Sequence, residues 1–106
     1  MPVSIRGKSD RAVEQVADAL AGYAREHAGA RVEVYRQNSV SIRIRVVDRD
    51  FSNVGRADRH EILWRLLESL PEAVQSQVSL LLALTPKEAK TSFANAEFDN
   101  PIPSSL

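Results

Sequence analysis

The residues best suited to chemistry lie in two short stretches, "SIRIRVVDRD" and "RADRHEILW". Arg43 and Arg45 alternate along an expected strand, and Arg56 and Arg59 flank the beginning of an expected helix. Guanidinium groups bind phosphate through paired hydrogen bonds, so these four arginines would form a phosphate-binding patch if their surfaces adjoin. Tyr35 is the one ring expected on the same open strand face. The alternative interpretation is an ordinary solvated face.

His60 and Trp64 are the other candidate site residues, and both belong to the second expected helix. The dipole at the helix start disfavours imidazolium, so His60 either serves a site or only helps the helix begin. Trp64 lies away from the centre of the apolar stripe, and tryptophan is enriched at binding hot spots. It is therefore a candidate partner anchor, unless the tail covers it through Phe93, Phe98 or Ile102.

Catalytic and metal-binding patterns are missing from the sequence. There is no cysteine, and the second histidine, His27, belongs to a different expected helix. Asp48, Asp50 and Asp58 follow a strand and precede a helix, where aspartate usually serves turns and caps. No phosphate-binding loop, dinucleotide fingerprint, nucleophile elbow or zinc signature is present. We therefore expect a non-enzyme with no catalytic residue, no cofactor and no metal.

Composition limits the partners. The 106 residues carry 14 basic and 14 acidic side chains, so no net charge attracts the chain to nucleic acid or membrane. The N-terminal "MPVSIRGKSD" lacks the apolar region of a secretory signal, and "LLLAL" is too short to cross a bilayer. We expect a cytoplasmic protein with one domain.

The elements follow from hydrophobic period and capping residues. Asp10 is expected to cap a first helix that ends near Gly29, after which "RVEVYRQNSVSIRIRVVD" alternates as a hairpin with its bend at residues 37–39. A second helix is expected from Asp58, with Asp58 and Glu61 in capping-box spacing. A short helix follows near residue 72, then the apolar strand "VSLLLALT", expected to be covered on both faces. Thr85 to Glu88 predicts a last cap and a helix to about residue 94.

These elements give the order αββααβα and predict an α+β fold. The simplest packing is a three-stranded mixed sheet covered by helices, of the BolA-like or type II KH-like kind. We expect residues 1–9 to be a flexible N-terminus, residues 10–94 a single domain, and residues 95–106 a mobile or peripheral tail.

From residue 13 to residue 88 the chain resembles the BolA family. The similar segments are "VVDRDFSNVGRADRHEIL", with Arg59-His60 at a helix start, and "QVSLLLALTPKE", a strand followed by Thr-x-Lys-Glu. The resemblance implies a protein partner, a monothiol glutaredoxin in the members that share an iron–sulfur cluster with one. Those members use a histidine where this chain has Ser79, and the segment at residues 37–39 supplies neither histidine nor cysteine.

Three hypotheses for function remain open at this point. The first is a small non-catalytic adaptor or regulator whose surface combines the open hairpin face with the second helix. The second is a nucleic-acid-binding protein that uses the arginine-bearing surface. The third is a homodimeric interaction domain that uses the open sheet face or Trp64.

Overall fold

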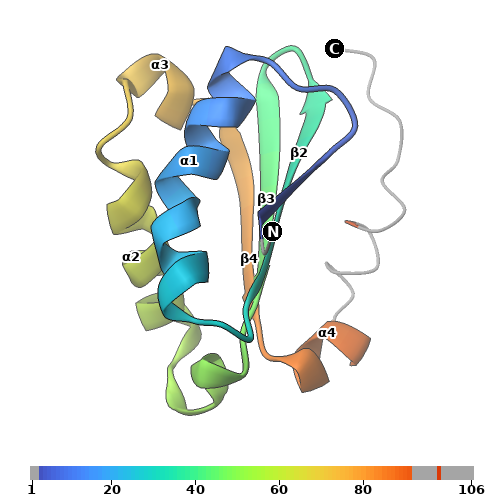
Figure 1. Ribbon diagram of the computed structural model, residues 1–106, viewed down its shortest axis with the longest axis vertical. Helices are drawn as coiled ribbons and strands as arrows, with labels where there is room; N and C mark the ends of the chain where they lie inside the picture. Colours follow the sequence, from blue (N-terminus) through green and yellow to red (C-terminus); the bar gives the residue numbers. More distant parts are fainter. Residues whose placement is uncertain (1–2, 92–97, 99–106) are drawn as a thin grey trace.

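The computed structural model describes residues 3–91 and Phe98, and within them four strands form one mixed sheet. In chain order the elements are β1 (Val3–Arg6), α1 (Arg11–Glu26), β2 (Arg31–Asn38), β3 (Ser41–Val47), the 3-10 helix η1 (Arg49–Asn53), α2 (Arg56–Leu67), α3 (Glu72–Gln75), β4 (Val78–Leu84) and α4 (Pro86–Thr91). The strand order is β1-β2-β3-β4, with β2 and β3 antiparallel and both edge strands parallel to their neighbours. Helices α1 and α2 cover one face (Figure 1).

Strand β1 was not predicted. We expected three strands and a flexible N-terminus over residues 1–9, and both expectations are wrong for residues Val3–Arg6. Residues Val3–Arg6 pair in parallel with Val32–Tyr35 of β2, so the order of strands and α-helices is βαββααβα. A four-residue stretch carries too little alternation to reveal a strand. Its conformation depends on the edge that β2 offers, and β-strand preference is dominated by such context.

The first helix begins as predicted. The Asp10 side chain accepts a hydrogen bond from the Val13 backbone N–H at 2.9 Å, which satisfies one of the free donors of the first turn. The helix turns an apolar stripe toward the sheet. The fully enclosed core combines this stripe with the helix-facing side chains of β2, β3 and α2: Val13, Val16, Leu20, Val32, Val34, Ile42, Ile44, Val46, Leu63 and Leu67.

The hairpin turn lies later than predicted. Strand β2 continues to Asn38, so the chain turns at Ser39 and Val40, and Val40 is 55% exposed at the tip. The Asn38 side chain accepts a hydrogen bond from the Val40 N–H at 2.9 Å. Asparagine therefore forms the turn through its side chain while its backbone still belongs to the strand.

The second helix begins earlier than predicted. It starts at Arg56, with Gly55 as the N-cap and no side-chain cap, and Arg59 N–H donates to the Gly55 carbonyl at 3.0 Å. Asp58 lies inside the first turn, where its charge suits the helix dipole. The expected capping box of Asp58 and Glu61 is therefore wrong.

The sheet face opposite α1 and α2 carries an aromatic and cationic cluster around Phe98. The Phe98 side chain is fully buried, with the guanidinium groups of Arg6 and Arg45 each 4.7 Å from its ring centre. Tyr35 meets the same ring edge-on at 6.2 Å. Phe98 thus packs on the open face of β2 and β3 and not over Trp64. The rest of the expected tail, residues 95–106, lies outside the described residues, as do residues 92–94 of the expected last helix.

Replacing Phe98 tests this packing. We expect Phe98→Ala to lower the free energy of unfolding by about 3 kcal/mol, because it removes a buried ring and its contacts with two guanidinium groups. Urea denaturation followed by circular dichroism measures the change. Val40→Ala at the exposed turn is the matched control, and equal effects of the two substitutions would contradict the packing.

Candidate functional site

Three of the predicted site residues form a ridge along α2. Arg56, His60 and Trp64 are four residues apart, which places them on one side of the helix. His60 and Trp64 line a cavity of about 250 Å³ with Val78–Leu81, and Arg56 and His60 line a second cavity of about 190 Å³ with Leu81–Leu84. His60 belongs to both cavities. They follow the whole of β4, and we call them together the α2–β4 groove.

The edge strand β4 supplies the other wall of this groove. Among the described strands it pairs only with β3. Its register places Leu81 and Ala83 beside the core residues of β3, and Leu80 and Leu82 beside Arg43 and Arg45 on the open face. All four are half-buried. The predicted strand is confirmed, but described residues cover neither face completely.

Ser79 lies at an irregular point of β4. The pairing moves from Ile42 with Val78 directly to Arg43 with Leu80, so Ser79 is an extra residue in the strand. Such a bulge re-aims a side chain at a strand edge. Ser79 is exposed and lines the same cavity as His60 and Trp64.

The two aromatic groups of the ridge are arranged as a pair. The His60 and Trp64 rings stack with their centres 6.2 Å apart and their planes 13° from parallel. His60 is exposed, whereas Trp64 is half-buried and packs against the core. The groove lining contains one imidazole and one hydroxyl but no carboxylate. It therefore offers an apolar surface with polar edges, which suits binding better than acid–base or nucleophilic chemistry.

Arg59 does not share the exposed ridge, although it was predicted to belong to the same surface as Arg56. It is 5% exposed and forms an ion pair with Glu88 at 2.5 Å. Its guanidinium group also donates to the carbonyl of Val54 at 2.7 Å and that of Ala83 at 3.2 Å. Arg59 therefore fastens α2 to the end of β4 and to α4.

Glu88 is the ion-pair partner of Arg59 and also forms the predicted cap of α4. Its carboxylate accepts a hydrogen bond from the Thr85 N–H at 2.9 Å, and the Thr85 hydroxyl accepts one from the Glu88 N–H at 3.2 Å. This reciprocal pair is a capping box, as the sequence predicted. Hydrogen bonds from Arg59 and from the Thr85 backbone lower the pKa of Glu88 to about 2.

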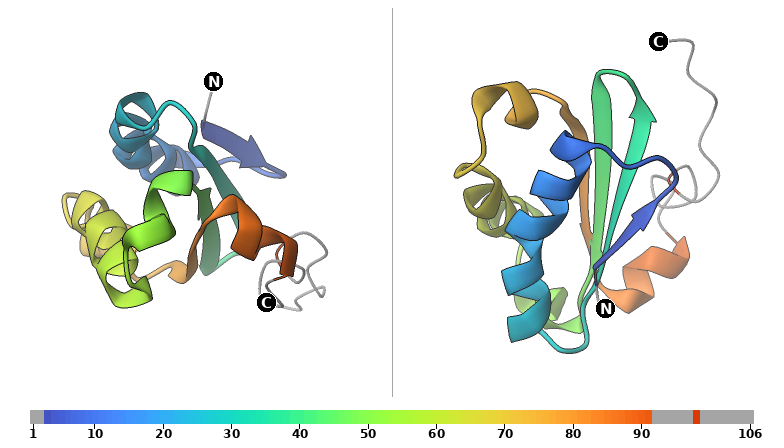
Figure 2. Two further views of the ribbon diagram at one scale, coloured as in Figure 1. Left: turned by 90° about the horizontal axis from the view of Figure 1, so that it is seen from below. Right: turned by 45° about the horizontal axis from the view of Figure 1, so that its top comes forward.

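The remaining predicted site residues lie on the opposite face of the sheet. Tyr35, Arg43 and Arg45 occupy the open face with Phe98 beside them. Helix α2, which carries the ridge, covers the other face of the sheet (Figure 2). Arg45 is 8% exposed and pairs with Glu33 at 2.5 Å, so the expected solvated face is wrong at this position. The predicted residues therefore form two surfaces, with β4 at the edge between them.

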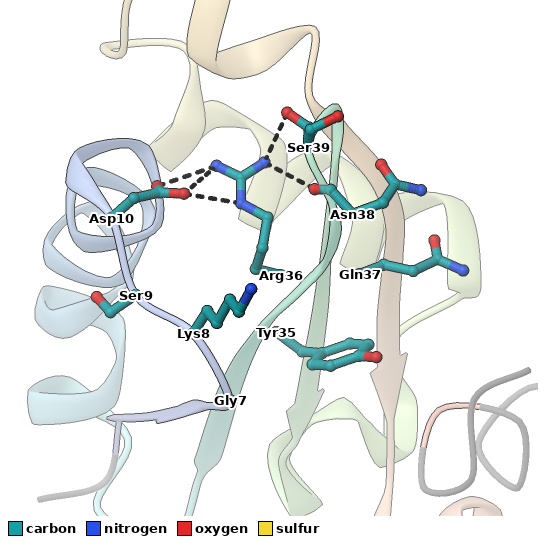
Figure 3. A pocket seen from close by; sticks show the side chains of 9 residues that line it. All are labelled: Gly7, Lys8, Ser9, Asp10, Tyr35, Arg36, Gln37, Asn38 and Ser39. Carbon is teal, nitrogen blue, oxygen red and sulfur yellow. Dashed lines mark hydrogen bonds and ion pairs between the residues drawn. The ribbon is translucent and has the colours of Figure 1, made fainter. Parts of the chain in front are cut away.

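A larger polar cavity lies between the loop that precedes α1 and the end of β2, and it was not predicted from the sequence. It has a volume of about 810 Å³ and is lined by the loop from Gly7 to Asp10 and by residues 35–39 of the hairpin (Figure 3). Arg36 is its central cation, and it is paired with Asp10 at 2.8 Å and with the Gln77 side chain at 2.7 Å. The ion pair with Asp10 balances the charge of Arg36 and connects the start of α1 to the hairpin.

Comparison with solved structures finds a similar fold in BolA1 from Arabidopsis thaliana. The two chains share 15% sequence identity at a TM-score of 0.51, and the match covers 76% of this chain and 98% of that one. The chain has a BolA-like fold. No protein-family model and no curated protein matches its sequence. The predicted α+β class and the predicted BolA-like resemblance are thus confirmed for the fold, with four strands in place of three.

None of the helices in the described part of this chain is both long and apolar enough to span a bilayer.

The Arg59–Glu88 pair predicts a pH-dependent stability. Because the pKa of Glu88 is about 2 in the folded protein and 4.5 ordinarily, its contribution is complete above about pH 5 and is lost as the pH falls toward 2. We expect Glu88→Gln to lower the free energy of unfolding by about 2 kcal/mol at pH 7, since it leaves Arg59 without a counter-charge. The difference from the unmodified protein should shrink between pH 5 and pH 2.

Urea denaturation at several pH values measures this difference. Glu61→Gln is the control, because it removes the exposed pair with Arg65 and should change stability by less than about 0.5 kcal/mol. A difference between Glu88→Gln and the unmodified protein that stays constant from pH 7 to pH 2 would contradict the role of the Glu88 carboxylate.

Proposed function

We propose that this chain is a small non-catalytic adaptor or regulatory protein that binds a partner protein in the α2–β4 groove. The observation that carries the proposal is the continuity of this groove along an edge strand. An apolar strand with an open backbone edge is a liability in water unless another chain pairs with it or covers it. Here the ridge of Arg56, His60 and Trp64 runs beside that strand.

The groove favours one kind of occupant, an extended segment of the partner that adds to β4 as a further strand. Backbone hydrogen bonds provide affinity in this mode, and pockets for alternate side chains provide selectivity. The Arg59 guanidinium already donates a hydrogen bond to the Ala83 carbonyl. The part of the strand edge available for pairing therefore runs from Val78 to Leu82. Apolar side chains of the partner would contact Trp64 and Leu81.

Charge adds a further preference. Arg56 and His60 are exposed along the groove, and within the described part of the chain neither has an ion-pair partner. The lining contains no acidic side chain. A partner segment that carries a carboxylate near its apolar residues would therefore complement the groove, and charge complementarity chiefly improves association rate and specificity.

A monothiol glutaredoxin is the first partner to test, because the BolA resemblance implies one. The resemblance matches Ser79 to the family's cluster-ligand histidine, and a hydroxyl is a poor ligand for iron–sulfur clusters. We therefore propose that this chain binds such a partner without donating a ligand to a cluster. The visible spectrum of a cluster-loaded glutaredoxin should stay unchanged when this chain is added.

Trp64 reports on the groove directly because it is the single tryptophan of the chain. We expect its emission to change during titration with a tryptophan-free variant of the glutaredoxin. Arg56→Glu should weaken the binding at least tenfold, because it places a negative charge beside the incoming carboxylate. Calorimetry provides the affinities.

Arg11→Glu is the matched control, since it makes the same charge change at the exposed start of α1 and should leave the affinity unaltered. Equal losses in both variants, or binding without any change in Trp64 emission, would contradict the groove as the interface. Absence of binding would contradict glutaredoxin as the partner. Light scattering distinguishes self-association through β4, the homodimer alternative, from binding of a different protein.

The nucleic-acid alternative has less support than a protein partner. Of the four arginines predicted for it, Arg45 is paired with Glu33 and Arg59 with Glu88. Arg56 and Arg43 belong to different surfaces of the sheet. A phosphate backbone requires several cations along one path, because each neutralised phosphate adds to the affinity. The arginines do not form such a path.

A further inference from the structure

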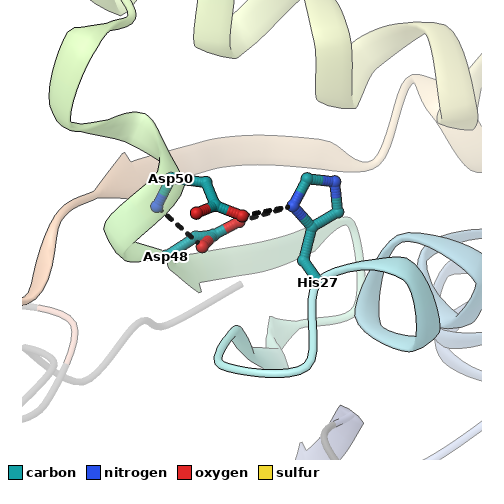
Figure 4. Close-up of side chains that lie close together, drawn as sticks. All are labelled: His27, Asp48 and Asp50. Atoms are coloured by element: carbon teal, nitrogen blue, oxygen red, sulfur yellow. Dashed lines mark hydrogen bonds and ion pairs between the residues drawn. The ribbon is translucent and has the colours of Figure 1, made fainter.

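A second cluster of functional side chains lies at the opposite end of α1 from its Asp10 cap, away from the groove. His27 caps the C-terminus of α1, Asp48 follows β3 and caps η1, and Asp50 lies in η1. Their side chains converge from three elements (Figure 4), and one ligand atom from each lies within 4.8 Å of the others. The two aspartates were expected to serve turns and caps, and they were not connected with His27, which lies 23 positions before Asp50.

Two carboxylate oxygens approach the same ring nitrogen. His27 Nδ1 is 3.0 Å from an Asp50 oxygen and 3.2 Å from an Asp48 oxygen. A single N–H group can point well at only one of these oxygens, so one hydrogen bond accounts for only one of the two short contacts. A tetrahedral cation with bonds of about 2.0–2.1 Å has ligand atoms about 3.3 Å apart. The two nitrogen–oxygen separations lie close to that spacing.

The surrounding residues hold the ligand groups in place. The Tyr23 hydroxyl donates to Asp48 Oδ2 at 2.6 Å, and the Asp50 N–H donates to Asp48 Oδ1 at 3.0 Å. The Tyr23 ring stacks on the His27 imidazole with 4.0 Å between centres and 10° between planes. Tyr23 and Asp48 are buried, so these contacts fix the orientation of two of the three ligands. Metal sites depend on such supporting hydrogen bonds to orient their ligands.

We propose that His27, Asp48 and Asp50 bind a divalent transition-metal cation of the zinc class. His27 Nδ1 and one oxygen from each aspartate would be the ligands. One imidazole nitrogen and two carboxylate oxygens suit Zn²⁺ better than Mg²⁺ or Ca²⁺, which prefer oxygen ligands alone. The side chains of His27 and Asp50 are 30% and 60% exposed, so a fourth position faces solvent. This inference replaces the expectation of no metal and does not depend on the groove.

Such a cation would join three parts of the fold. It would connect the end of α1 to the segment that links β3 to α2, and would bring no residue of the α2–β4 groove into contact with metal. We expect Zn²⁺ to raise the melting temperature of the full chain, because ligands that bind only the folded state stabilise it by mass action.

Calorimetric titration of the full chain with ZnCl₂ tests the site, and the residue counts simplify its interpretation. With two histidines and no cysteine, a site of this class can use only His27 or His60 as its nitrogen ligand from a side chain. We expect one equivalent of Zn²⁺ to bind, with a tenfold or larger loss of affinity in His27→Gln and in Asp50→Asn. His60→Gln should bind as the unmodified protein does.

Histidine ring signals in NMR spectra provide a second measurement that does not depend on affinity. Zn²⁺ should shift the signals of His27 and leave those of His60 in place. Asp50 is exposed, so Asp50→Asn should keep the fold and still lose the binding. Uptake that is equal in the unmodified protein and in His27→Gln, uptake lost only in His60→Gln, or no saturable uptake up to about 1 mM Zn²⁺ would overturn the site.

Discussion

The buried guanidinium of Arg59 determines how α2 sits beside the sheet. It reaches Glu88 of α4, the carbonyl of Ala83 in β4 and the carbonyl of Val54 before α2. A buried arginine is costly unless its charge is balanced and its N–H groups have acceptors. These conditions are met only when α2, β4 and α4 hold their observed positions. The interaction therefore selects one arrangement of the elements that form the groove.

Within the described part of the chain, this arrangement leaves a groove between α2 and β4. Arg59 approaches β4 at its C-terminal end, and the ridge of Arg56, His60 and Trp64 follows the strand from outside. The core beneath is filled by Leu63 and Leu67. The helix is thus held by its buried side and by one end, while its outer edge lines the groove in which we propose that a partner binds. Preorganisation of this kind lowers the cost of association.

Much of the fold could be predicted because its signals are local. Asp10 caps α1, Thr85 and Glu88 form their capping box, and the apolar run 78–84 is the last strand. The structure differs from the prediction where contacts between distant parts of the chain determine the conformation. Strand β1 exists because β2 offers it an edge, and no property of four residues reveals that.

The candidate site likewise has parts that could be predicted from the sequence and parts that depend on long-range contacts. His60 and Trp64 were predicted on the second helix, whereas Arg56 was expected near its start and joins them because the helix begins earlier. The wall that β4 forms beside them was not predicted. Arg59 was predicted on the surface because arginine usually lies there, and its burial depends on a partner 29 positions away. The cluster of His27 with two aspartates depends on the meeting of α1 and η1. Side chains of ordinary spacing acquire such partners only when the chain is folded.

Amide hydrogen exchange of the chain, alone and with a bound protein partner, shows whether β4 is the binding edge. We expect binding to protect the amides of β4 between Val78 and Leu82 and to slow exchange in neighbouring α2, while the hairpin tip near Val40 exchanges as before. Protection confined to the open face around Tyr35, with β4 unchanged, would contradict β4 as the binding edge.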